Sequence, residues 1–367
     1  MTASSEPLAN REAPTGGAPT GGAPTGGVST GGISTGGAST GGAYPGQANA
    51  PPGQVKAPPG RSVRAVKFLK RLWSQRELQM MILPGIIFLA IFAYSPMYGV
   101  VIAFNNYKLS DPIINSNWVG LKNFASFWGN RTFWSALTNT LMINFLNLIF
   151  VFPAPIIFSL LLNEVRSRPF KRITQSVSYL PHFLSWVIFG GMFINLLAQD
   201  TGAINIFLTK LGVIESPVLW MGNPDYFYAI AIITSLIKGL GWSAVIYLAA
   251  ITGVDQELYD AATIDGAKRL QTMWYITLPS ISGVIVIMLI FAISGLLNSG
   301  FDQMFILQNR LNISTAEVLD TYVYKIGIRE MRFSFATAVG LSRSVVAFIL
   351  LFIANFFANK ITGKGLF

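Results

Sequence analysis

The chain has 367 residues, of which 52% are hydrophobic and only 11% are charged. Soluble domains carry roughly 25% charged residues, so this composition indicates an integral membrane protein. The absence of cysteine excludes disulfides and thiolate metal sites, and the single histidine excludes a histidine-cluster zinc or haem site. The net charge of +10 can indicate nucleic acid binding. Here the basic residues flank apolar runs, so orientation in a membrane explains them better and no nucleic acid partner is expected.

The N-terminal region divides into two predicted segments. Residues 13–42 are six copies of a five-residue unit, and the chain up to Gly60 is rich in proline, glycine and alanine. Such a composition cannot bury a core, so residues 1–60 are predicted to form a disordered cytoplasmic tail, either a tether or a tolerated extension. Residues 61–78 alternate basic and apolar side chains at helical spacing, which predicts a basic amphipathic helix lying on the lipid membrane surface.

Six apolar runs follow, and each is long enough for the ~20 residues that a membrane-spanning helix needs. The first run and its outer loop occupy residues 79–131, the main membrane domain 132–358, and a cytoplasmic C-terminal tail 359–367. Pro153 and Pro155 predict a kink in the second run. The predicted spans are 80–104, 132–162, 177–199, 226–253, 280–307 and 333–358.

Lysine and arginine counts in the short loops predict the orientation. With the N-terminus inside, the cytoplasmic segments hold 14 of these residues and the outer loops hold 8. The chain is therefore expected to be a multi-pass protein of the cell membrane, with both termini in the cytoplasm. This orientation also places the loop 254–279, between the fourth and fifth spans, on the cytoplasmic side.

The 254–279 loop is predicted to form two short helices that meet at a glycine corner. Asp255 is a suitable N-cap for the first helix, and Gly266 supplies the backbone freedom that ends it. Pro279 ends the second, amphipathic stretch. The small side chains of Ala261 and Ala262 leave a surface that another protein can approach closely. The alternative is an ordinary connector.

This loop resembles the signature of membrane permease subunits of type I binding-protein-dependent ABC importers, and the resemblance runs from about residue 78 to the C-terminus. Asp260 stands where that family usually has glutamate, which puts any long-reach salt bridge of that residue in doubt. Other motifs resemble the carbohydrate branch, with its lipoprotein-linked oligosaccharide and polysaccharide permeases. The matching stretches are Asp260-Ala261-Ala262, Asp265-Gly266-Ala267, Ile276-Thr277-Leu278-Pro279, Pro96-Met97-Tyr98-Gly99, Trp118-Val119-Gly120-Leu121, Asn139-Thr140, Phe170-Lys171, Tyr179-Leu180-Pro181-His182-Phe183 and Gly241-Trp242.

The resemblance implies an all-α membrane protein with six transmembrane helices and the type I permease fold. It implies a second homologous permease as a heterodimer partner, two cytoplasmic ATPase subunits and an extracytoplasmic solute-binding lipoprotein that delivers sugar. The loop residues implied to contact the ATPase are Tyr259, Asp260, Ala261, Ala262, Asp265, Gly266, Ala267, Leu278 and Pro279.

The chain has no phosphate-binding loop of its own. Gly363-Lys364 is followed by Gly365 and lacks the earlier glycine that the motif requires. ATP and Mg²⁺ are therefore expected on the partner ATPase. The chain is expected to bind no cofactor or metal and to be a transport subunit without a catalytic residue.

Polar residues inside the spans are the candidates for the pathway. Lys238 and Arg343 each cost ~2.5–3.5 kcal/mol at a bilayer centre, so they are expected to line the pathway or to pair with carbonyls or a carboxylate of the partner permease. If both line the pathway, an acidic oligosaccharide is the expected substrate. His182 is expected to form structural hydrogen bonds and not to relay protons. Weaker candidates are Asn144, Asn147, Asn195, Asn298 and Asp302.

Three classes of function fit a polytopic membrane protein. The motifs favour the ABC importer permease, working by alternating access. An ion-coupled secondary carrier fits less well, because the spans are nearly free of aspartate and glutamate. A membrane scaffold without transport is the third class, and it predicts no coupling between ATP hydrolysis and a loaded binding protein.

Overall fold

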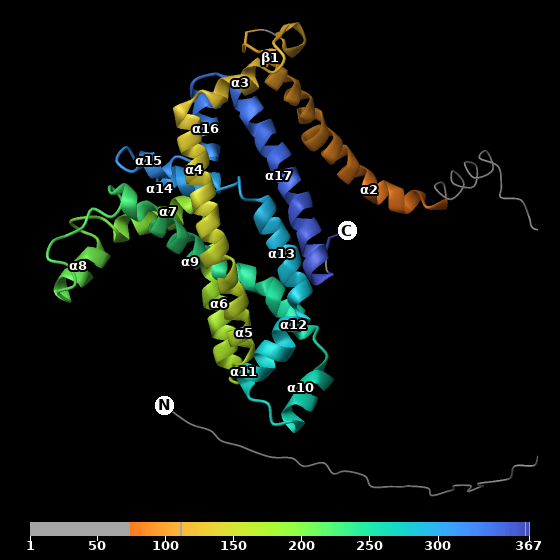
Figure 1. Cartoon of the computed structure of the whole chain (residues 1–367), viewed down its shortest axis with the longest axis vertical. Helices are drawn as coiled ribbons and strands as arrows, with labels where there is room; N and C mark the ends of the chain where they lie inside the picture. Colours follow the sequence, from red (N-terminus) through yellow and green to blue (C-terminus); the bar gives the residue numbers. More distant parts are fainter. Residues whose placement is uncertain (1–73, 111, 364, 367) are drawn as a thin grey trace, which may run out of the picture. The chain divides into compact units, whose positions relative to one another are not determined.

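The computed structural model describes residues 74–110, 112–363 and 365–366. The predicted tail 1–60 and residues 61–73 of the predicted basic helix lie outside these residues. Residues 75–367 form one unit, which is drawn as a ribbon in Figure 1.

Four helices in the described part of the chain are long and apolar enough to cross a membrane without a sharp bend. Their bounds agree to within a few residues with the first, second, fourth and sixth predicted spans. They are Arg76–Phe104 (α2 Arg76–Leu89, π-turn Ala90–Tyr94, 3-10 helix Ser95–Phe104), Arg131–Asn163 (α4 Arg131–Leu146, π-turn Asn147–Val151, α5 Pro153–Asn163), α9 Pro224–Thr252 and α17 Phe333–Thr362.

The predicted kink of the second span corresponds to a widened turn just before the prolines. The backbone N–H of Phe152 donates to the carbonyl of Asn147, 2.9 Å away, across five residues. Pro153 has no N–H to continue the regular ladder, and a π-turn accommodates that missing donor. This turn lies where α4 passes into α5.

The third predicted span is broken in the structure. Helix α6 begins at Arg168, earlier than expected, and ends at Phe183; α7, Trp186–Leu196, leaves it at 100°. Ser185 caps the new helix, accepting a hydrogen bond from the N–H of Ile188 at 3.3 Å. A continuous apolar run therefore contains a sharp corner.

The fifth predicted span, 280–307, is not one helix. A first arm, Arg269–Ser280, meets α13, Ser282–Ser294, at 63°. The chain then leaves helical geometry for residues 295–300, and Gly300 adopts a positive φ of 75° before α14, Phe301–Leu307. The arm consists of α11 Arg269–Thr272, a π-turn Met273–Thr277 and α12 Leu278–Ser280.

Short elements connect the spans and define two ends of this unit (Figure 1). We call the two ends the β1 end and the α10 end. Near the β1 end lie a two-stranded antiparallel sheet, α3 and the first turns of α4 and α17, and the α10 end carries α10 and α11. The remaining elements are β1 Asn105–Asn106, a 3-10 turn Ile113–Asn115, β2 Asn117–Trp118, α3 Lys122–Trp128, α8 Ala203–Lys210, α10 Gln256–Ile264, α15 Ile313–Ala316, α16 Leu319–Tyr324 and a π-turn Lys325–Arg329.

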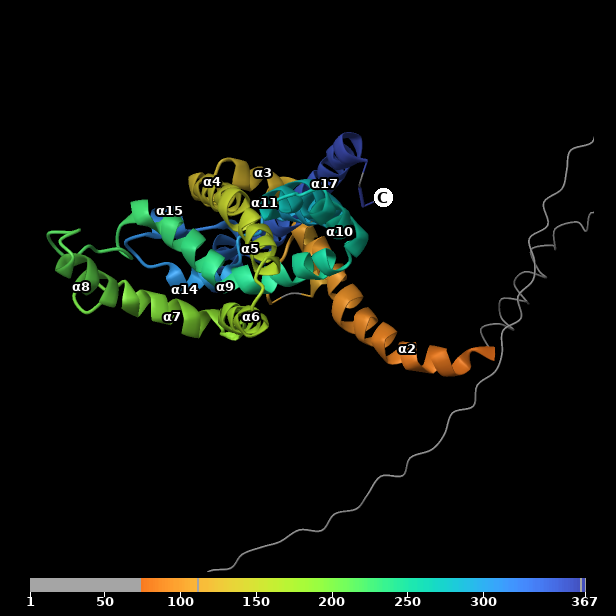
Figure 2. The ribbon, with the colours of Figure 1, turned by 90° about the horizontal axis from the view of Figure 1, so that it is seen from below.

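Small residues set the closest helix contacts. A side chain at Gly241 of α9 would overlap the backbone carbonyl of Ser178 in α6, and one at Gly190 of α7 would collide with Ile306 of α14. In lipid, helices associate through such close packing and through polar contacts, because lipid tails are as apolar as the side chains. Helix α2 packs less: only 6% of the most apolar window of its span is buried, and Figure 2 shows it leaving the bundle.

Candidate functional site

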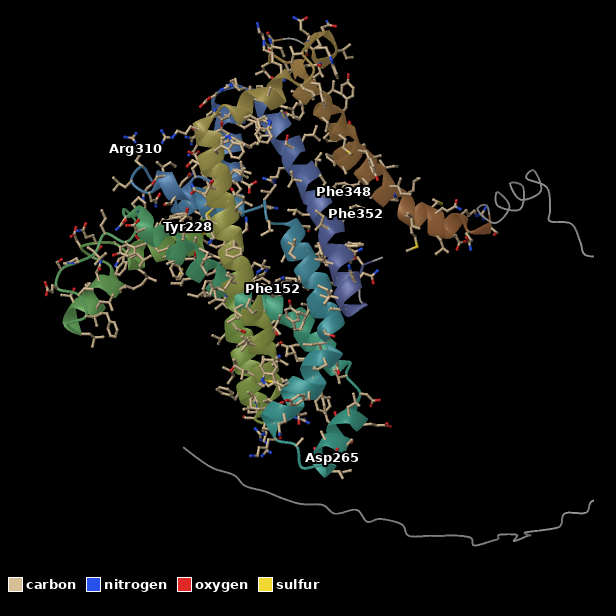
Figure 3. All side chains as sticks on the ribbon, in the orientation of Figure 1. Phe152, Tyr228, Asp265, Arg310, Phe348 and Phe352 are labelled. Atoms are coloured by element: carbon tan, nitrogen blue, oxygen red, sulfur yellow. The ribbon has the colours of Figure 1, made fainter. Side chains whose placement is uncertain are left out.

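An open cavity of about 580 Å³ lies between the α4–α5 span, α9 and α13. Three of the predicted pathway residues, Asn144, Asn147 and Asn298, line it together. Trp242 and Ser243 of α9 also line it, and Phe152, labelled in Figure 3, belongs to its apolar wall. The described residues of this lining carry no charge. Such a neutral mixture of carboxamides and an aromatic face suits a ligand rich in hydroxyl groups.

The two N–H groups of the Asn144 carboxamide are shared among three acceptors. Its Nδ2 lies 3.0 Å from the carbonyl of Thr140, 2.9 Å from that of Leu296 and 3.0 Å from Oγ of Ser299. Asn147 follows one turn later, and its Oδ1 is enclosed without a hydrogen-bond partner among the described residues. Asn298, in the irregular link 295–300, lines the same cavity.

Trp242 joins this cavity to the corner between α6 and α7. The imidazole of His182 stacks on the Trp242 ring, with centroids 4.4 Å apart and planes 2° from parallel, and Phe183 meets the same ring edge-on. His182 thus contributes an aromatic contact to the wall. Reading the sequence for hydrogen bonding alone did not reveal this stack.

Lys238 lies at the same corner and does not line the cavity. Its Nζ donates to the carbonyls of Pro181 at 3.0 Å and His182 at 3.1 Å, and also to the carbonyl of Leu184. The rings of Trp186 and Phe189 lie 5.3 and 5.5 Å from the same Nζ. Three carbonyls at the C-terminal end of α6 are therefore bonded to a lysine of α9 in the same chain.

Arg343 also finds its partner within this chain. Its Nη1 bonds Oδ1 of Asp320 in α16, and both side chains are largely shielded from solvent. The other carboxylate oxygen, Oδ2, accepts a hydrogen bond from the backbone N–H of Ser299 at 3.1 Å. Sequence reasoning missed Asp320, because it falls in a segment assigned to an outer loop.

The other two candidates, Asn195 and Asp302, are exposed and lie apart from the cavity lining. The residue after Asp302 is more informative. Gln303 is buried, and its Nε2 donates to the carbonyl of Ala231 at 2.7 Å and to Oγ1 of Thr234 at 3.0 Å, which ties α14 to α9. A glutamine within an apolar run was the available signal for this contact.

The α10 loop has the predicted helix–corner–helix form. Oδ1 of Asp255 accepts the N–H of Glu257 at 3.0 Å, which confirms the predicted N-cap. Gly266 adopts a φ of +73°, as its place after the helix predicts. The N–H of Ala267 then bonds back to the carbonyl of Ala262 at 2.9 Å and closes the corner.

One side-chain contact joins the two arms of the loop. The hydroxyls of Tyr259 in α10 and Thr277 in the second arm lie 3.1 Å apart. Ala262 is the buried residue of α10, while Asp260, Ala261, Asp265 and Pro279 are exposed and Leu278 is half-buried. The carboxylate of Asp260 contacts only its own helix among the described residues, at Nε2 of Gln256, 3.4 Å away.

Apolar side chains are unusually exposed around this corner. Ile264 is 86% exposed and Tyr275 80%, and Leu270 and Trp274 are also exposed. A hollow of about 320 Å³ beside Gly266 is lined by Asp265, Gln271 and Tyr275. Figure 3 places Asp265 at the tip of the loop, at the extreme α10 end of the bundle. Ile264 lies in α10, outside the candidate spans, and the other three side chains lie in the first arm of the bent fifth span. An exposed apolar group at such a corner is typical of a protein contact surface.

The chain is similar to known transport proteins over most of its length. Residues 151–363 match the family described as binding-protein-dependent transport system inner membrane component. The chain is 44% identical over 301 residues to the polygalacturonan/rhamnogalacturonan transport system permease protein YteP of Bacillus subtilis, covering 82% of this chain and 93% of that protein. Protein LplB of the same organism is 41% identical over 304 residues, covering 83% and 95%.

A solved structure has the same fold. One chain in the crystal structure of a bacterial alginate ABC transporter, in complex with an alginate pentasaccharide-bound periplasmic protein, superposes with a TM-score of 0.74 at 34% identity. The match covers 81% of this chain and 99% of that chain.

Proposed function

Because the chain belongs to the family of binding-protein-dependent transport system inner membrane components, we propose that the central cavity is its half of a sugar pathway. The single observation that carries the proposal is the meeting of Asn144, Asn147 and Asn298 with Trp242 in one neutral cavity. Sugars are bound through their hydroxyl groups by amides and through their apolar faces by aromatic rings. A second permease supplies the other half in a heterodimer.

The relatives and this cavity together support a proposal for the substrate class. Two proteins similar to this chain carry names or titles that specify polygalacturonan and rhamnogalacturonan, or alginate. We propose that the cargo is an oligosaccharide derived from an acidic polysaccharide. Lys238 and Arg343 hold helix ends and loops in this proposal and do not bind the cargo, because neither lines the cavity and each is bonded within the chain.

The α10 end is proposed to face the cytoplasm and to dock on one of two ATPase subunits. The exposed Ile264, Leu270 and Tyr275 support this surface, and the charge bias of the loops supports the orientation. ATP and Mg²⁺ belong to the ATPase. The solute-binding protein then delivers sugar at the β1 end, and both chain termini lie in the cytoplasm.

Force from the ATPase can enter the membrane through this rigid corner. Movement of α10 is passed to the base of the fifth span through the Tyr259–Thr277 contact and through the backbone closed at Gly266. The fifth span bends by 63° where that arm meets α13, and α13 forms one wall of the cavity. Closing of the ATPase pair would thus shift one cavity wall against another, as alternating access requires.

The test is to fill the cavity in the assembled transporter. Ser243→Phe places a large ring in the lining, and Ser344→Phe, at an exposed position of α17, is the matched control. In proteoliposomes with the whole complex and its binding protein, the first variant should lose import of galacturonan oligosaccharides at least tenfold while ATP hydrolysis still responds to the binding protein. Import equal to the control, or uptake driven by an ion gradient without ATPase subunits, contradicts the proposal.

A further inference from the structure

The orientation of one carboxamide in the cavity can be assigned from its neighbours. Two of the three atoms around the amide end of Asn144 are the backbone carbonyls of Thr140 and Leu296. Carbonyl oxygens only accept hydrogen bonds, so the NH₂ group must face them. Since Asn144 lines the cavity, Oδ1 is the atom that it can offer there, and that atom only accepts.

A chain of polar contacts outside the cavity holds this orientation. Nδ2 of Asn144 donates to Oγ of Ser299, and the backbone N–H of Ser299 donates to Oδ2 of Asp320. Asp320 is in turn bonded by Arg343. The contacts run from α4 through the irregular link 295–300 to α16 and α17, so four separate segments meet in one network.

The link needs such support because it has no regular backbone ladder. Residues 295–300 lie between α13 and α14 and end at Gly300 with a positive φ. The same link supplies Asn298 to the cavity wall. Ser299 follows Asn298 in the chain and accepts a hydrogen bond from Asn144. By accepting the N–H of Ser299, Asp320 therefore supports both of these lining residues.

We propose that Asp320 and Arg343 are positioning residues, which hold Asn144 with its acceptor oxygen facing the sugar pathway. This inference rests on the cavity being that pathway. The wall then recognises hydroxyl groups of the cargo, which donate to Oδ1, and it gives no preference to a carboxylate, which cannot donate when ionised. Arg343 therefore acts on selectivity through a neutral amide and not by pairing with an acidic sugar.

The experiment is a double-mutant cycle on binding. It uses the purified permease–ATPase complex held with ATP and vanadate, and measures the Kd of a fluorescent galacturonan oligosaccharide and of its carboxyl-reduced, neutral counterpart. Asn144→Leu, close in size, should raise both Kd values by about tenfold. Asp320→Asn should raise both Kd values less in the Asn144→Leu background than in the native chain, because the two side chains act as one unit.

Companion variants keep the test decisive. Should Asp320→Asn fail to assemble, Ser299→Ala removes only the connecting hydroxyl and should show the same non-additivity with Asn144→Leu. Arg343→Lys keeps the charge and should retain most of the affinity. Arg310→Gln, an exposed arginine away from the cavity in Figure 3, is the control for loss of a cation.

Three results overturn the inference. Strictly additive effects show that Asp320 does not act through Asn144. Arg343→Gln removes the charge, and a loss of affinity confined to the acidic oligosaccharide in this variant shows that the arginine contacts the carboxylates of the cargo directly. Unchanged Kd values in Asn144→Leu remove the acceptor role of Asn144. If the cavity itself were not the pathway, Ser243→Phe would also leave import intact, which separates failure of this inference from failure of the proposed function.

Discussion

The cavity wall and the α10 loop differ in which chemical groups they leave available for contact. The NH₂ of Asn144, which lines the cavity, and the charged groups of Lys238 and Arg343, which do not line it, are all bonded within the chain. At the loop, the backbone corner is also closed by a hydrogen bond, but the side chains of Ile264 and Tyr275 are exposed. A permanent protein partner can cover apolar groups, whereas a transient cargo must leave. The contrast teaches that rigidity is common to both sites and that only the exposed chemistry differs.

The largest expected effect comes from a substitution in the α10 loop. Gly266→Val forces a β-branched residue into a φ of +73°, at a cost of about 1–2 kcal/mol, and should disturb the corner that presents Ile264. Membrane levels should stay normal, while co-purification of the ATPase and import should fall by tenfold or more. Gly266→Asn, which tolerates this backbone, should retain most activity. Undiminished import by the valine variant, with the ATPase bound at the normal yield, would contradict the prediction.

The next effect concerns the corner beside the cavity. Lys238→Met removes the ammonium from three carbonyls near the end of α6, although the carbonyl of Pro181 still accepts the backbone N–H of Leu184 at 3.3 Å. We expect a loss of stability on the order of 2 kcal/mol, seen as a lower melting temperature of the purified complex. Import of acidic and neutral oligosaccharides should fall together. Lys210→Met, at the end of α8, serves as the control. A selective loss of acidic cargo at unchanged stability would instead show that the lysine senses substrate charge.

A smaller effect should sharpen the link between the two regions. Tyr259→Phe removes the hydroxyl that contacts Thr277 but keeps the ring. We expect about 0.5–1.5 kcal/mol of lost coupling, visible as more ATP hydrolysed per sugar imported. Thr277→Val should give a similar result, and the double variant should add little to either one. An unchanged ratio of ATP hydrolysed to sugar imported in both single variants would show that the hydroxyl contact does not contribute to coupling.

The smallest effect is expected at the N-terminus, which belongs to neither region. Deleting residues 1–60 should leave import unchanged, because this composition cannot form a packed core. Deleting residues 61–76 should lower membrane insertion or stability, since that segment carries the basic amphipathic pattern. Quantitative blotting of membranes beside uptake assays checks both. A loss of uptake at normal membrane levels in the first deletion would assign a role to the repeats.

Local signals in the sequence were sufficient for much of the architecture. Apolar run length located four continuous spans, and the cap at Asp255 and the corner at Gly266 follow from residue type and position. The 100° break after Phe183 did not follow, because hydropathy averages across a bend. A proline in the last turn and a serine cap were present there, but both also occur in unbroken membrane helices.

The candidate site was predictable only in part. Asn144, Asn147 and Asn298 could be selected as polar residues in apolar runs, and they do meet in one cavity. The orientation of Asn144 could not be deduced, because its partners Leu296 and Ser299 lie in a distant segment. The partner of Arg343 lies 23 residues away in another segment, and no spacing rule relates the two. Long-range pairing of this kind becomes visible only when the segments are placed in space.

The neutral lining of the cavity bears on turnover. In a low-dielectric channel, a fixed cation opposite each uronate would form a deep electrostatic trap, which every cycle would have to overcome. Neutral acceptors such as Asn144 release a hydroxyl for about 1 kcal/mol each, and passage requires binding weak enough to allow escape. Because the described lining of this chain's half of the pathway offers no cation, an acidic oligosaccharide can keep its counterions where it faces that half. Its residence time would be set by the motion of the helices and not by the strength of its own charges.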